Sequence, residues 1–350
     1  MMKFLDQKPN NRYHLVAFFA MILALLIVML GAYTRLIDAG LGCPDWPACY
    51  GKAVLPSAGD QIDLNQAQHL FPAQPLILKK TWMEMAHRYA ASLLALLVLG
   101  LAFSSFKQRK RFSIHAIVIS WVLVVIVILQ ALLGKWTVTF HLLPLVVTGH
   151  LMGGMCIVGL LCWLVNATHG YHFRNACRIN VLKPWAIIGL LIITIQIFLG
   201  AWTSTNYSAL ACTDFPYCHG NLFPPMDWAH AFNFKNPIGP NYDGGQLDIN
   251  ARVTIQMVHR FGAFITTMYL VPFALCLLLI KDFIPLKNLG FILLLLLVGQ
   301  ICLGALNIVM LLPLQMAVAH NGIAALLLLT MVTLLYRIYA SNPRRNHYYQ

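Results

Sequence analysis

The stretch Trp82-Met-Glu-Met-Ala-His-Arg-Tyr-Ala-Ala-Ser92, followed by an unbroken apolar run, decides the fold of this chain. It places Glu84, His87 and Arg88 at the head of a segment that is apolar enough to span a membrane. An ionisable side chain near the bilayer centre costs about 2.5–3.5 kcal/mol on insertion scales, so such residues generally mark a functional site. The pattern returns as Gln256-Met-Val-His259-Arg260, which indicates that the segment was duplicated.

The composition is that of a polytopic membrane protein. Of the 350 residues, 59% are hydrophobic and 10% are charged, and the mean hydropathy is +0.72. A soluble domain carries about 25% charged residues. A transmembrane helix needs about 20 apolar residues. The sequence therefore predicts an all-α membrane protein with eight spans, at 14–34, 82–103, 114–134, 145–167, 184–203, 253–280, 288–310 and 315–337.

The formal net charge of +13 follows the expected topology. More than half of the 24 Lys and Arg residues fall in segments that are cytoplasmic if the N-terminus is cytoplasmic. This distribution matches the positive-inside rule, so we expect both termini in the cytoplasm and no binding of nucleic acid. The first span has no small-residue cleavage site after it and no Arg- and Ser-rich presequence before it, which predicts a retained helix in a bacterial inner membrane.

The motifs of the first half recur in the second half at a nearly constant spacing. The shift is 169 for the cysteines, 170 for Gln130, Gly134 and His150, and 172 for His87. The sequence therefore predicts two tandem, pseudo-symmetric four-helix bundles, at 1–167 and 184–350, joined by a cytoplasmic linker at 168–183. Four spans per unit keep both copies in the same orientation, so a pseudo-two-fold axis along the membrane normal is expected.

Four histidines lie within the spans, each expected five or six residues from the outer end of an even-numbered span: His87, His150, His259 and His320. Each one alone could be a hydrogen-bonded packing residue. A zinc site would need three or four ligands in one cluster. Two histidines on facing helices of a bundle are typical of bis-imidazole haem ligation. Arg88 and Arg260 would then meet haem propionates or extend to the membrane surface.

The two halves differ at one position beside these histidines. Glu84 and His87 lie one turn apart on the same helix face. A carboxylate there could exchange protons or orient a water molecule, whereas the amide of Gln256 in the second half cannot exchange a proton in the useful range. This difference predicts proton-coupled chemistry in the first half and a haem for electron transfer or structure in the second. The alternative is that Glu84 only pairs with Arg88 or Arg35.

Each predicted outer loop contains two cysteines with five residues between them, Cys43 and Cys49 in the first half and Cys212 and Cys218 in the second. Disulfides persist on the outer face of the membrane. Such a short loop suits a disulfide over the mouth of the pocket, and both a structural role and redox exchange remain open.

Together these residues resemble the haem A synthase family over nearly the whole chain. The matching motifs are Gly31-Ala-Tyr-Thr-Arg-Leu, Gly40-Leu, Asp45-Trp-Pro-Ala-Cys49, Glu84-x-x-His87-Arg88, His150, His259-Arg260 and His320. The long loop at 224–245 resembles the proteobacterial and mitochondrial branch.

The resemblance implies an oxidoreductase that oxidises the C8 methyl group of haem O to a formyl group by successive hydroxylations. The product, haem A, would serve cytochrome oxidase assembly. The resemblance assigns substrate haem to His87 and His150, a haem b cofactor to His259 and His320, and an essential carboxylate to Glu84. It implies a haem O synthase as upstream partner and leaves the electron donor or acceptor unidentified.

The alternative function is a non-catalytic di-haem cytochrome b, which predicts tight bis-histidine ligation in both halves and no need for Glu84.

Overall fold

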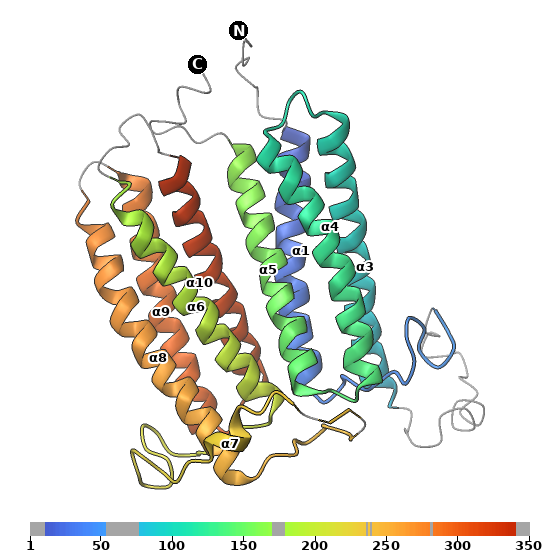
Figure 1. Cartoon of the computed structure of the whole chain (residues 1–350), viewed down its shortest axis with the longest axis vertical. Coiled ribbons are helices and arrows are strands. Elements are labelled where there is room, and N and C mark those ends of the chain that lie inside the picture. Colours follow the sequence, from blue (N-terminus) through green and yellow to red (C-terminus); the bar gives the residue numbers. More distant parts are fainter. Residues whose placement is uncertain are drawn as a thin grey trace.

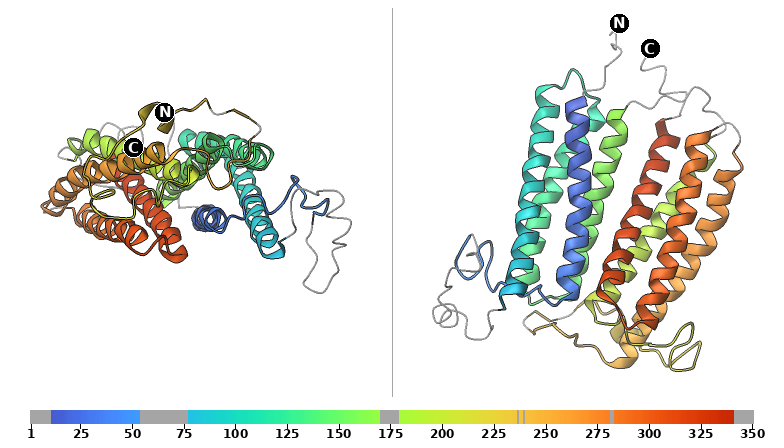
Figure 2. Two further views of the ribbon diagram at one scale, coloured as in Figure 1. Left: turned by 90° about the horizontal axis from the view of Figure 1, so that it is seen from below. Right: turned by 180° about the vertical axis from the view of Figure 1, so that it is seen from behind.

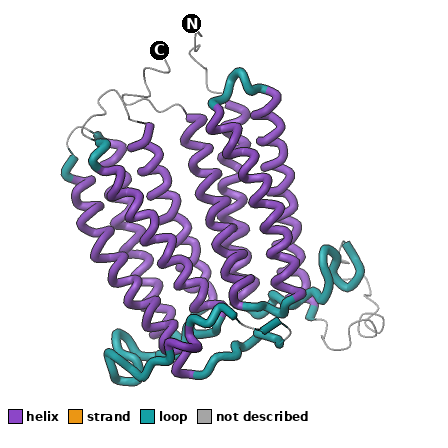
Figure 3. Tube along the Cα trace, viewed as in Figure 1, coloured by secondary structure: helices purple, strands orange, loops and turns teal. Residues whose placement is uncertain are grey.

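The computed structural model describes residues 11–53, 77–169, 179–235, 237–238, 240–280 and 283–340. Eight long helices run side by side through these residues, which contain no strand beyond two isolated bridges (Figures 1 and 3). All eight are long and apolar enough to cross a membrane, which confirms the predicted fold class. They are α1 (Asn11–Leu36), α3 (Leu78–Lys107), α4 (Ile114–Thr139), α5 (Pro144–His169), α6 (Leu182–Thr205), α8 (Ile249–Leu278), α9 (Ile284–Val309) and α10 (Leu314–Ala340).

The helices α3 and α8 begin about one turn earlier than the apolar pattern predicts. Each starts with a polar turn, which contains Lys79 and Lys80 in α3 and Asn250 and Arg252 in α8. Hydropathy detects only the apolar part of a helix, so it misses such turns. As a result His87 and His259 lie more than two turns inside their helices rather than five or six residues from the start.

The helices form two groups of four (Figure 1). In the first group, contacts link α1 to α3, α3 to α4, α4 to α5 and α5 back to α1, so the four helices make a closed ring. In the second group α6, α8, α9 and α10 repeat this ring in the same order. The predicted linker falls between α5 and α6, and most of it, at 170–178, lies outside the described residues.

The two groups meet through equivalent surfaces. The contact of α1 with α10 corresponds to that of α6 with α5, and α5 also meets its own equivalent, α10. At the end that carries the cysteine loops, Arg35 donates a 3.0 Å hydrogen bond to the carbonyl of Ser204, and the hydroxyl of Tyr207 donates one of 3.4 Å to Asp38. Each bond joins positions separated by 169 residues, which is the repeat shift. Equivalent positions can touch only near the axis that relates the two halves.

One end of the bundle carries the cysteine loops and the short helix α7 (Trp228–Ala231), while α1 begins and α10 ends at the other end (Figures 1 and 2). The loop that precedes α8 also reaches across to the first group. The backbone N–H of Tyr242 donates a 3.0 Å hydrogen bond to the carbonyl of His141, and the Tyr242 ring is buried beside Leu142 and Leu143. The second half therefore covers part of this end of the first.

The turn from α4 to α5 is repeated in the turn from α9 to α10. His141 and Leu142 have φ angles of 48° and 62°, and their equivalents Leu311 and Leu312 have 57° and 64°. Left-handed backbone is uncommon in residues other than glycine. Its presence at matching positions supports a common origin for the two turns, although His141 itself has no histidine counterpart.

Candidate functional site

The first histidine pair lies across the interior of the first helix group. His87 comes from α3 and His150 from α5, which stand diagonally opposite in the ring of helices. Their ring centroids are 6.4 Å apart, with the ring planes inclined at 69°. Bonds from a metal to imidazole nitrogen are about 2.0–2.1 Å long, so two rings that bind one ion from opposite sides have centroids about 6 Å apart. The observed separation fits one iron atom between the two rings.

A glycine on the neighbouring helix faces each of the four histidines. A Cβ atom built on Gly31 or Gly200 would lie 3.1 Å from Cε1 of His87 or His259. A Cβ atom built on Gly134 would lie 3.4 Å from Cε1 of His150, and one built on Gly304 would lie 3.2 Å from Cε1 of His320. Any side chain at these positions would press on the imidazole, because 3.1–3.4 Å is tighter than ordinary carbon contacts. The glycines thus define where the rings can lie.

The ring nitrogens of the first pair suit ligation. Nδ1 of His87 and Nδ1 of His150 are buried and have no hydrogen-bond partner among the described residues. Because Nδ1 is enclosed in both rings, Nε2 is the nitrogen available to a ligand. Among the described residues, no three His, Cys, Asp or Glu side chains form a metal-binding cluster. Two facing imidazoles in an apolar bundle therefore fit a haem group better than a zinc ion.

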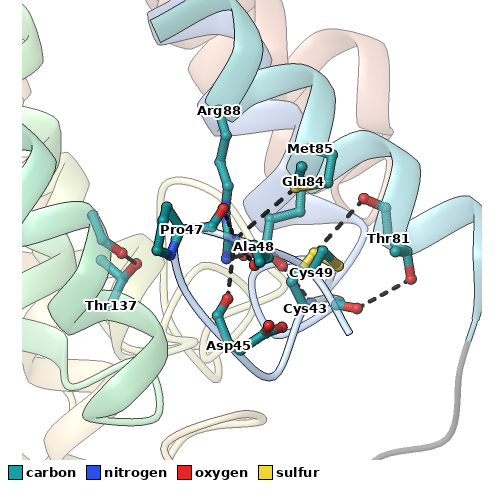
Figure 4. A network of polar contacts seen from close by, with 12 residues as sticks. Cys43, Asp45, Pro47, Ala48, Cys49, Thr81, Glu84, Met85, Arg88 and Thr137 are labelled. Carbon is teal, nitrogen blue, oxygen red and sulfur yellow. Dashed lines mark hydrogen bonds and ion pairs between the residues drawn. A yellow bond between two sulfur atoms is a disulfide. The ribbon is translucent and has the colours of Figure 1, made fainter. Parts of the chain in front are cut away.

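The carboxylate of Glu84 lies between α3 and the first cysteine loop (Figure 4). It is 6% exposed. Its Oε2 accepts a 2.8 Å hydrogen bond from the backbone N–H of Cys43, and its Oε1 pairs with the Arg88 guanidinium at 2.5 Å. Of the two basic partners expected for Glu84, Arg88 is therefore the one it contacts. Arg35 instead pairs with Asp38 at 3.5 Å.

The Arg88 side chain ties the cysteine loop to α3 (Figure 4). Its Nη1 donates hydrogen bonds to three loop carbonyls, those of Asp45 at 3.0 Å, Pro47 at 3.3 Å and Ala48 at 2.8 Å. In the second half Arg260 likewise donates to the carbonyls of Pro216, Tyr217 and Cys212. Contact of either arginine with a haem propionate stays a prediction.

In the second half an amide takes the place of the carboxylate. Gln256 Oε1 accepts a 2.5 Å hydrogen bond from the backbone N–H of Cys212, as Glu84 does from Cys43. Its Nε2 donates to the carbonyls of Ala209 and Cys212, at 2.8 Å and 3.2 Å. Arg260 then binds the Cys212 carbonyl instead of the side chain at 256. Both residues hold a cysteine loop, but only Glu84 adds a charge that can take up a proton.

The two cysteine loops have the same internal structure. Disulfides join Cys43 to Cys49 and Cys212 to Cys218, and each loop contains a cis X–Pro bond. A carboxylate closes each loop from inside: Asp45 accepts from the N–H groups of residues 50 and 51, and Asp214 from those of 219 and 220. These bonds, that from Gly220 above all, hold the pKa of Asp214 below its usual value. The 169-residue spacing of the two aspartates was the signal in the sequence for this role.

The sequence did not predict a hydrogen-bond network at the end of the bundle that carries the cysteine loops. The Arg35 guanidinium stacks on the Tyr207 ring at 4.0 Å, and the Tyr207 hydroxyl donates to Asp243 as well as to Asp38. Burial raises the pKa of Tyr207 to about 12, so the phenol stays protonated. Arg35 has no basic counterpart, because position 204 is Ser.

Comparison with known proteins agrees with the motifs. The family model COX15-CtaA, described as "Cytochrome oxidase assembly protein", matches residues 14–332. A protein of Shewanella oneidensis named "Heme A synthase" is 42% identical over 320 residues, which cover 90% of this chain and 93% of that protein. A protein of Bartonella quintana with the same name is 23% identical over 352 residues, which cover 93% of this chain and 91% of that protein. The chain belongs to the COX15-CtaA family of cytochrome oxidase assembly proteins.

Proposed function

We propose that this chain is an enzyme that oxidises the C8 methyl group of haem O to a formyl group and so supplies haem A for cytochrome oxidase. Two successive hydroxylations give a geminal diol, which loses water to leave the formyl group. The family match and the name of the Shewanella oneidensis relative support the substrate and product. The observation that carries the catalytic assignment is the exchange of Glu84 for Gln256 at equivalent positions beside two histidine pairs.

The first half is the substrate half in this proposal. His87 and His150 hold haem O between α3 and α5, and Glu84 lies one turn from His87 on the outer side. With water as the oxygen source and a separate partner that accepts two electrons, each hydroxylation (R–CH3 + H2O → R–CH2OH + 2H+ + 2e−) releases two protons. Glu84 accepts such a proton and passes it toward the outer face, while Arg88 stabilises its charge. Arg88 and Arg260, which reach the cysteine loops, would hold haem propionates at that end of the bundle.

The second half is the cofactor half. His259 and His320 would hold a haem b, which when bound supplies one-electron transfer. Gln256 keeps the loop in place there without exchanging protons.

We place the chain in a bacterial inner membrane, with both termini in the cytoplasm and the cysteine loops on the periplasmic side. The basic residues near the inner ends of the spans support this orientation. The substrate, haem O, is delivered by a haem O synthase within the same membrane. The electron donor or acceptor is a separate partner.

The test is haem extraction and chromatography from cells that make this protein together with a haem O synthase. We expect haem A with the intact chain and none with Glu84→Ala. The matched control is Gln256→Ala, which removes the same loop hydrogen bond from the second half and should leave haem A present. Failure of the intact chain to form haem A, with bis-histidine haem spectra in both halves, would favour the di-haem cytochrome b instead.

A further inference from the structure

The histidine of the second half has a side-chain partner in α6. Nε2 of Gln196 lies 3.1 Å from Nδ1 of His259 and donates a 3.0 Å hydrogen bond to the His259 carbonyl. Gln196 therefore contacts the same histidine through both its ring and its backbone. A second hydrogen bond to a metal-ligating histidine fixes the orientation of the ring and raises its basicity.

A glycine in α8 makes room for this glutamine. Gly262 lies one turn beyond His259, and a Cβ atom built on it would overlap Oε1 of Gln196 and lie 3.0 Å from Cδ1 of Leu199. With any other residue at 262 the Gln196 amide could not occupy this place. The pair Gln196 and Gly262 is thus a matched set that supports His259.

The first half has no such pair at His87, although Gln130 packs on Gly153, three residues after His150, in a similar way. At the repeat shifts, Ile27 stands where α6 has Gln196, and Ala90 stands where α8 has Gly262. Nδ1 of His87 is buried and has no hydrogen-bond partner among the described residues. Both halves keep the histidines and the glycines that face them, so the partner of Nδ1 at His259 is a specific difference from the equivalent His87.

We propose that Gln196, seated on Gly262, is a positioning residue that makes His259 a permanent haem ligand, whereas unsupported His87 belongs to a site whose haem exchanges. This inference rests on the proposed function, in which the second half keeps a cofactor and the first half takes in substrate and releases product. A resident cofactor requires slow dissociation, and a substrate site requires fast release of product.

The amide can serve Nδ1 in two orientations. In the structure its nitrogen faces Nδ1, which suits an imidazole with its proton on Nε2. An imidazole that binds iron through Nε2 carries its proton on Nδ1. A half-turn of the amide then presents Oε1 as the acceptor and gives up the bond to the His259 carbonyl. Oε1 of Gln196 is buried without a partner in the structure, and this second orientation satisfies it.

The test uses full-length protein from cells that lack haem O synthase, so that haem b is the haem available. Transfer of haem to apomyoglobin measures retention, and redox titration measures the midpoint potential. We expect Gln196→Leu to weaken haem retention about 10–100-fold, the usual effect of losing such a partner. The control Thr194→Val, on the same helix, removes only a hydroxyl bonded to the Leu190 carbonyl and should change neither readout.

Two further variants separate positioning from folding. Gly262→Ala leaves Gln196 in the chain but expels its amide, and we expect it to reproduce the loss of retention. Gln196→Glu keeps an acceptor for the Nδ1 proton, and we expect it to restore retention while lowering the midpoint potential. Unchanged retention and potential in both Gln196→Leu and Gly262→Ala would overturn the proposal.

A transplant provides the reciprocal test. The double variant Ile27→Gln/Ala90→Gly gives His87 the missing partner, and we expect the first half to keep its haem through purification, so that haem per chain rises. No rise in haem content would count against the proposal. Because none of these readouts requires conversion of haem O, failure of the enzyme assignment and failure of the Gln196 assignment are distinguishable.

Discussion

Glu84 accepts a 2.8 Å hydrogen bond from the backbone N–H of Cys43, which makes the carboxylate both a support of the disulfide loop and a neighbour of His87. Substitution Glu84→Gln separates these two roles, because an amide oxygen can keep the loop bond, as Gln256 does. We expect the protein to keep its fold and its disulfide. Haem A formation should fall by roughly 10²–10⁴-fold, the usual contribution of general acid–base catalysis. Haem A yield near that of the unsubstituted chain would show that the charge of Glu84 is not needed.

The carboxylate of Asp45 should protect the first disulfide. It accepts two backbone hydrogen bonds, of 2.6 Å and 2.9 Å, inside the loop from Cys43 to Cys49. Loss of hydrogen bonds to a charged group costs about 1.5–3 kcal/mol. We expect Asp45→Ala to make the Cys43–Cys49 bond easier to reduce, measured by thiol labelling at increasing dithiothreitol. The Cys212–Cys218 bond in the same molecule is the internal control, and equal labelling of both pairs would contradict this role of Asp45.

The glycines that face the histidines should control haem binding one half at a time. A side chain at Gly31 would press on His87, and one at Gly200 would press on His259. We therefore expect Gly200→Val to abolish the haem b that is retained in the absence of haem O synthase. Gly31→Val should leave this haem in place but abolish haem A formation.

The control for both variants is Gly100→Val in α3, where a Cβ atom would meet nothing within 4 Å. It should retain haem b and haem A formation. Loss of both haems in either facing-glycine variant would mean that the substitution disrupts the bundle rather than one site.

Tyr207 should couple the two halves at neutral pH and release them at high pH. Its pKa is raised by burial from 10.0 to about 12, so the folded state holds the phenolic proton more tightly than the unfolded state. The stability that Tyr207 contributes is therefore complete below pH 10 and is lost as the pH rises through 12.

We expect Tyr207→Phe to lower the stability by about 1 kcal/mol at pH 8, the usual net worth of a hydrogen bond. It should also flatten the fall in melting temperature between about pH 10 and pH 12, the window given by the pKa shift. Thermal unfolding in detergent at several pH values is the measurement, with Tyr217→Phe, an exposed position in the second cysteine loop, as the comparison. A steep alkaline fall that persists in Tyr207→Phe would assign it to other groups.

The sequence was sufficient for the fold class, the two cysteine pairs and the pairing of His87 with His150. These residues are rare types within apolar spans, and duplication placed each of them twice at one spacing. The polar first turns of α3 and α8 were missed because hydropathy does not register them.

The role of Arg88 on loop carbonyls, the network of Arg35 with Tyr207, and the contact of Gln196 with His259 were also missed. Such hydrogen bonds depend on where main-chain groups and neighbouring helices lie in space, and an unpaired glutamine in an apolar span has no partner visible in the sequence.

The bonds from Arg35 to Ser204 and from Tyr207 to Asp38 join positions that are equivalent in the two repeats. A surface that meets its own equivalent has the form of a homodimer interface, here between two repeats of one chain. In a homodimer the same codon encodes a residue in both subunits, so equivalent positions on the two sides of the axis must carry the same residue. Fusion into one chain removed that constraint. It allows Arg opposite Ser and Tyr opposite Asp at the interface, and it allows Glu beside one histidine pair and Gln beside the other, which is the difference that the proposed division of labour requires.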